Sequence, residues 1–180
     1  MRTITTPKEL EVFLKRLRQR GRGVSPAIEK AVKAIINDVR LHGDAALKRL
    51  TRKFDGHENI LLSPKTIKKY ADRADRKVLS AMEFSARRIR SFHERQKEAS
   101  WSFKENGIEL GQIIGPVGRA GIYVPGGRAP YPSSVLMNVV PAQVAGVKEI
   151  ALTVPTPGGE INPEVMAAID LLGIKEVYSV

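Results

Sequence analysis

The C-terminal part of the chain alternates short apolar runs with helical segments, and this alternation constrains the fold more than any other feature. Apolar runs occupy residues 119–124, 149–154 and 175–180, and helical periodicity fills 135–145 and about 162–172 between them. Strands that alternate with helices are typical of βαβ units, in which the strands are parallel and the helices cover the sheet. The sequence therefore predicts an α/β fold containing a parallel sheet.

The N-terminal part has helical periodicity instead. Proline, serine and glycine signals divide it into predicted helices over residues 8–20, from 26 to about 54 with a break at Gly43-Asp44, and about 65–99 with an interruption near 72–75. A hairpin is predicted around Asn106-Gly107, and Ser133-Ser134 is predicted to cap the helix that starts at Val135. We therefore divide the chain into a helical segment, 1–104, and a partial nucleotide-binding domain, 105–180.

The two segments differ in charge. Residues 1–104 hold 26 basic and 12 acidic residues, a balance of +14, whereas residues 105–180 hold 4 and 7, a balance of −3. Most basic residues fall opposite the apolar stripes of the predicted helices, as on any solvated helix surface. The chain has no helix-turn-helix signature and no RNP-like aromatic motif. We therefore predict no nucleic-acid partner.

Composition excludes several further classes of protein. Because the chain has no cysteine, it has no disulfide framework, thiolate nucleophile or cysteine-ligated zinc. Its three histidines, His42, His57 and His93, are far apart in sequence, and His42 and His57 are expected to be exposed beside turns. No apolar run approaches the roughly 20 residues of a membrane span, and the charged N-terminus lacks a signal-peptide core. We expect a cytoplasmic protein with no membrane partner.

The best local candidate for a site is the run Tyr123-Val-Pro-Gly-Gly127, where a predicted strand turns toward a helix. In open α/β sheets, ligands bind at the carboxyl ends of strands, and Gly126 and Gly127 would let a ligand approach the backbone closely. Alternatively, the Pro-Gly-Gly sequence serves only to make the turn. Tyr123 likewise has two interpretations: a core residue with its hydroxyl satisfied, or a ring presented to a flat cofactor.

The segment GPVGRAGIYVPGGRAPYPSSVLMNVVPAQVAGVKEIALTVPTP, residues 115–157, closely resembles the histidinol dehydrogenase family. The N-terminal runs VRLHGDAAL (39–47), KFDG (53–56) and IRSFHERQ (89–96) agree with the same family, in the same order. The resemblance implies a Rossmann-like domain related in fold to the aldehyde dehydrogenases. It also implies NAD-dependent oxidation of L-histidinol to L-histidine, the last step of histidine biosynthesis, by a zinc-containing homodimer. The tyrosine of the family's YxPGG motif contacts NAD and corresponds to Tyr123, so that we take Tyr123, Gly126 and Gly127 as cofactor-binding candidates.

The resemblance also implies that the zinc ligands and the Glu-His pair for acid–base work lie in later segments of the family's chain. The predicted strand at 175–180 has no helix after it to cover its next face. We therefore expect an N-terminal fragment of the enzyme, inactive alone, with no catalytic residue or zinc ligand of its own. The alternative is a stand-alone nucleotide-binding or regulatory module without catalysis.

Overall fold

The computed structural model describes residues 4, 6–20, 25–126 and 130–180, which group into two compact units, residues 1–46 and 47–180. Helix α2 (Pro26–Asp55) crosses this boundary. The sequence-based division at residue 104 stays a prediction about domains. The helices between residues 47 and 104 nevertheless lie in the same compact unit as the sheet.

The first unit holds α1 (Pro7–Arg20) and the N-terminal part of α2. The predicted break at Gly43 is confirmed, because Gly43 leaves the helical region with φ 52° and ψ −133°. A positive φ of this kind is easily adopted only by glycine. The apolar stripes predicted on both helices are exposed within the described residues; they comprise Leu10, Phe13, Leu14, Leu17, Ile28, Val32, Ile35 and Ile36.

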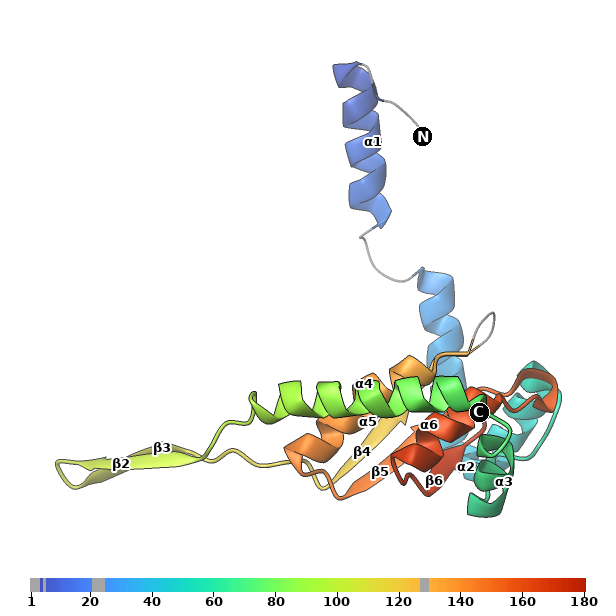
Figure 1. The fold of residues 1–180 in the computed structure, drawn as a ribbon. Coiled ribbons are helices and arrows are strands. Elements are labelled where there is room, and N and C mark those ends of the chain that lie inside the picture. Colours follow the sequence, from blue (N-terminus) through green and yellow to red (C-terminus); the bar gives the residue numbers. More distant parts are fainter. Residues whose placement is uncertain (1–3, 5, 21–24, 127–129) are drawn as a thin grey trace. The chain divides into compact units, whose positions relative to one another are not determined.

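The second unit is built on a four-stranded sheet with the order β1-β6-β5-β4 (Figure 1). Strands β4 (Arg119–Tyr123), β5 (Glu149–Thr153) and β6 (Glu176–Tyr178) are parallel, which confirms the predicted α/β fold. The sequence did not indicate β1 (Leu61–Leu62), a two-residue strand that pairs antiparallel with β6.

One face of this sheet is covered by helices. Helices α5 (Pro132–Ala145) and α6 (Pro163–Leu171) connect the parallel strands and pack against each other. Helix α3 (Pro64–Ala71) packs on α6, and α4 (Arg76–Glu94) packs on both α5 and α6 (Figure 1). The core between these elements includes Val139 and Ile169 from the helices and Leu152 and Val177 from the strands, all fully buried.

The opposite face of the sheet carries the alternate side chains of the same strands. Arg119 at the start of β4 forms ion pairs with Glu149 of β5 and Glu176 of β6, and the Tyr178 hydroxyl donates to Glu176 at 2.7 Å. Toward the carboxyl ends, this face presents Tyr123, whose side chain is exposed. Because residues alternate between faces along a strand, the apolar run 119–124 therefore has one buried and one open side.

The predicted hairpin is confirmed. Strands β2 (Trp101–Glu105) and β3 (Ile108–Gln112) pair antiparallel in a sheet of their own. Asn106 and Gly107 both have positive φ, 49° and 81°, as a two-residue hairpin turn requires. All ten strand residues are exposed.

None of the helices in the described ranges has an apolar stretch long enough to cross a bilayer.

Candidate functional site

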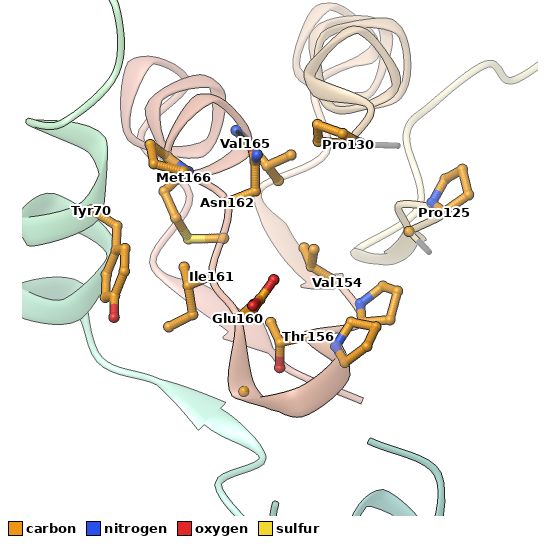
Figure 2. A pocket seen from close by; sticks show the side chains of 15 residues that line it. Tyr70, Pro125, Pro130, Val154, Thr156, Glu160, Ile161, Asn162, Val165 and Met166 are labelled. Atoms are coloured by element: carbon orange, nitrogen blue, oxygen red, sulfur yellow. Dashed lines mark hydrogen bonds between the residues drawn. The ribbon is translucent and has the colours of Figure 1, made fainter. Parts of the chain in front are cut away.

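A pocket of about 590 Å³ lies where the chain leaves β4 and β5. Its walls come from Pro125 and Gly126 after β4, from the loop 154–163 after β5, from the first turn of α6, and from Tyr70 on α3 (Figure 2). A volume of this size is typical of small-molecule sites. The carboxyl ends of parallel strands are also where open α/β sheets bind their ligands.

Proline makes up an unusual share of the pocket wall. Five of the lining residues are prolines: Pro125, Pro130, Pro155, Pro157 and Pro163. A proline ring fixes φ and leaves few conformations to the chain around it. The five prolines therefore restrict the backbone at their own positions in the pocket wall.

Gly126 packs closely against the loop after β5. A Cβ atom placed on Gly126 would lie 2.5 Å from Cγ and 3.3 Å from Cδ of Pro155. The proline ring is not a flexible side-chain end that swings away at small cost. Glycine at this position therefore keeps the loop after β4 tight against the loop after β5, at the wall of the pocket.

Thr156 is 2% exposed and is held by His57, 99 residues away in sequence. The His57 Nε2 atom lies 2.8 Å from the Thr156 hydroxyl and 3.1 Å from the Thr156 carbonyl oxygen. Since a carbonyl oxygen only accepts, Nε2 is the donor in that contact. The expectation that His57 is exposed is wrong: it is half-buried and ties the segment after α2 to the pocket wall.

The helix that follows the Pro-Gly-Gly turn begins differently from the prediction. Tyr131 occupies the N-cap position of α5 and no side chain caps the helix, whereas Ser133 and Ser134 lie inside its first turn. The predicted cap at Ser133-Ser134 is therefore wrong, because Pro132 starts the helix three residues before Val135. Prolines are favoured at a first helical position, where their missing N–H has no partner to lose. The positive end of α5 thus lacks a capping side chain.

The candidate residues from the sequence do not all meet at this pocket. Gly126 lines it, whereas Tyr123 lies on the open face of β4, 63% exposed, and is not among the described lining residues. That exposure does not fit the interpretation of Tyr123 as a core residue. Gly127 lies outside the described residues. NAD contact by these three residues stays a prediction.

Sequence reasoning did not single out Tyr70, Thr156 or Glu160, all of which line the pocket. Asn162 was recognised only as a helix start, which the structure confirms: its Oδ1 accepts from Val165 N at 2.9 Å. The available signal was the run Pro157-Gly158-Gly159 directly after an apolar strand. Such a run marks the loop at the ligand-binding edge as clearly as Pro125-Gly126-Gly127 does.

Zinc has no evident place among these residues. In the described part of the chain, no group of three His, Asp or Glu side chains could hold a metal ion. The three histidines have other contacts: His42 with Asp38, His93 with Gln96, and His57 with Thr156. The residues described here do not fit a zinc site, and we derive no chemical step from one.

The fold and the pocket together define a class of protein. Consecutive parallel strands joined by helices, with a glycine-lined pocket at their carboxyl ends, are the arrangement of nucleotide- and ligand-binding α/β proteins.

Comparison with known proteins narrows this class to a family. A sequence model of the histidinol dehydrogenase family matches residues 18–180. The chain is 44% identical over 182 residues to the histidinol dehydrogenase of Neisseria meningitidis serogroup A, which covers 98% of the chain and 42% of that relative. It is 46% identical over 160 residues to the enzyme of Pseudomonas syringae pv. tomato, which covers 86% of the chain and 36% of that relative. The crystal structure of histidinol dehydrogenase from Elizabethkingia anophelis superposes with a TM-score of 0.80 at 32% identity, over 88% of this chain and 37% of the other.

The chain belongs to the histidinol dehydrogenase family. It corresponds to an N-terminal portion and spans about two fifths of the length of the curated relatives it matches.

Proposed function

We propose that this chain forms part of the NAD site of an enzyme that oxidises L-histidinol to L-histidine. The observation that carries the proposal is the proline- and glycine-lined pocket at the carboxyl ends of β4 and β5, in a chain that belongs to the histidinol dehydrogenase family. NAD supplies the hydride acceptor for the two successive oxidations that this conversion requires. The protein's contribution here is to bind and orient that acceptor.

Three features of the described residues support a dinucleotide at this edge of the sheet. Gly126 lines the pocket, and its missing side chain lets the loop after β4 pack tightly against Pro155 of the loop after β5. The N-terminus of α5 begins with Pro132, which has no N–H, but unlike α6 it has no capping side chain, so its positive end favours a nearby anion such as a pyrophosphate. Tyr123 presents an exposed ring at the end of β4, where a flat base or nicotinamide would stack.

The remaining parts of the enzyme are proposed from the family alone. We propose that zinc, the acid–base residues and the histidinol site require segments outside these 180 residues. We further propose that the intact enzyme is a cytoplasmic homodimer. Zinc-assisted catalysis needs a ligand set fixed in geometry, and the described residues do not supply one.

Titration of the 180-residue chain with NAD tests the proposed site. Calorimetry should give saturable binding, and Tyr123→Ala should weaken it about 5-fold or more because a stacking ring is lost, an effect of order 1 kcal/mol. Tyr123→Phe, which keeps the ring, should bind as the parent chain does. Phe84→Ala is the matched control, since Phe84 is another exposed aromatic residue, on α4 outside the pocket.

A second measurement separates binding from catalysis. The chain mixed with NAD, L-histidinol and zinc should form no NADH detectable by fluorescence. Steady NADH formation would contradict the proposal that the chain holds only part of the active site. Absence of NAD binding at any accessible concentration would overturn the nucleotide site itself.

A further inference from the structure

Glu160 carries the only formal charge among the described residues that line the pocket. Figure 2 shows its carboxylate directed into the space ringed by the lining side chains. The neighbouring polar groups are neutral: the hydroxyls of Tyr70 and Thr156 and the amide of Asn162. The rest of the wall is apolar, including the five prolines.

A single carboxylate among neutral polar and apolar groups suits the ribose of a nucleotide and not its phosphates. A carboxylate only accepts hydrogen bonds, and its two oxygens match the two hydroxyl donors of a ribose diol. A phosphate in the same space would face a negative charge with no described cation among the lining residues. The α6 N-terminus beside it offers little compensation, because Pro163 lacks an N–H and Asn162 already caps the helix. The pocket therefore favours the ribose over any phosphate group.

Glu160 directly follows a short turn that its own backbone N–H closes. The short helical turn η1 (Pro157–Gly159) ends in two glycines with positive φ, 66° at Gly158 and 76° at Gly159. The Glu160 N–H donates to the Pro157 carbonyl at 3.2 Å and closes the turn. The side chain is thus presented by a constrained loop directly after β5.

The position in the topology points to one ribose in particular. Glu160 follows the second strand of the β4–α5–β5 unit. In dinucleotide-binding α/β domains, an acidic residue about 20 residues beyond the glycine turn binds the adenosine ribose of NAD, and NADP carries its extra phosphate on that ribose. Glu160 follows the corresponding strand at a longer spacing, 34 residues beyond Gly126. The negative charge in the pocket and the position of Glu160 in the topology therefore both point to the adenosine ribose.

We propose that Glu160 binds the adenosine ribose diol of NAD and excludes the 2′-phosphate of NADP. This inference rests on the proposed NAD site. It makes the Glu160 side chain responsible for a preference for NAD over NADP.

The test is a titration of the 180-residue chain with NAD, NADP and ADP-ribose, repeated with Glu160→Gln. We expect the parent chain to prefer NAD over NADP about 10-fold or more, the scale of one charged hydrogen-bonding group. In Glu160→Gln the affinity for NAD and ADP-ribose should fall several-fold, and the preference for NAD over NADP should shrink to about 3-fold or less. Glu164→Gln is the matched control: it removes the same charge from the first turn of α6, at a residue outside the pocket lining. Circular dichroism melting checks that both variants are folded.

The outcomes distinguish the two proposals. If NAD binds and Glu160→Gln leaves both its affinity and the NADP preference unchanged, the role of Glu160 is wrong while the NAD site stands. An equal effect of Glu164→Gln would also overturn it, because overall charge would then explain the change. If the parent chain binds neither NAD nor ADP-ribose, the proposed site fails and the role of Glu160 fails with it.

Discussion

At the scale of single residues, Gly126 has the narrowest tolerance in the candidate site. Its missing side chain leaves the space that the Pro155 ring occupies. Gly126→Ala should therefore push the two loops apart and weaken NAD binding about 10-fold, while the buried core keeps the melting temperature nearly unchanged. Calorimetric titration and thermal melting measure the two effects.

Gly121→Ala provides the control for that substitution. Gly121 lies on β4, close to Gly126 in sequence, and a Cβ there meets nothing within 4 Å. Its binding of NAD should match that of the parent chain. Unchanged binding by Gly126→Ala would show that the contact with Pro155 does not shape the site.

Single residues also show which parts of the candidate site could be predicted from the sequence and which could not. Gly126 was predicted as a site residue from its place in a strand-to-helix turn, and the structure puts it in the pocket wall. His57 was predicted to be exposed because its neighbours are turn formers, which is a local argument. Its contact with Thr156 joins positions 99 residues apart. No local pattern carries that information, because the pairing depends on how β1 and the loop after β5 are brought together.

At the scale of elements, the helices that cover the sheet were predicted well because their caps and periodicity are local properties. Ser63 caps α3 by accepting from Thr66 N at 3.0 Å, directly before Pro64 at the start of the helix. Asp75 caps α4 through Lys77 N at 2.6 Å, which explains the predicted interruption near 72–75. The α5 start was misjudged because Pro132 initiates the helix without any side-chain cap.

Helix α6 supplies much of the core, and a cavity there should be costly. Ile169 is fully buried between the sheet and its neighbouring helices. Ile169→Ala should lower the free energy of unfolding by about 2–5 kcal/mol, from lost burial and the cavity left behind. Urea denaturation measures the change.

An exposed position gives the comparison for this core substitution. Met137 lies on α5 with 53% of its surface exposed. Met137→Ala should change the free energy of unfolding by less than about 0.5 kcal/mol. Similar losses in both variants would mean that the α5–α6 layer is not the stabilising core.

At the scale of the whole molecule, the charge of +11 is concentrated in the first 104 residues. Basic side chains there lie on helices whose exposed surfaces they share with several acidic partners, such as Lys33 with Glu29 and Lys68 with Asp72. The Asp72 carboxylate has the largest effect and the Asp170 carboxylate the next, and both raise the pKa of Lys68. These two side chains therefore stabilise the charged form of Lys68. These ion pairs neutralise part of the basic surface, and the absence of a nucleic-acid partner stays a prediction.

The chain should therefore bind DNA only as any cationic surface does. Weak binding to a random duplex at about 50 mM salt should be lost by about 200 mM, since counterion release drives it. Fluorescence anisotropy with two unrelated duplexes measures this. Binding that survives at the higher salt and favours one sequence would contradict the prediction.

The two faces of the sheet have a consequence for how a ligand gains affinity. Gly126 and Glu160 line a pocket on one side of the carboxyl edge, and the Tyr123 ring stands on the open face of β4. A ligand that reaches both must span that edge, so a mononucleotide meets only half of the contacts. Once one nucleotide of a dinucleotide is bound, binding of the other becomes intramolecular. The second nucleotide then has an effective concentration in the millimolar range at its own contact. On this geometry we expect NAD to behave as a bivalent ligand of the proposed site, held by the linkage between its two nucleotides as much as by either one.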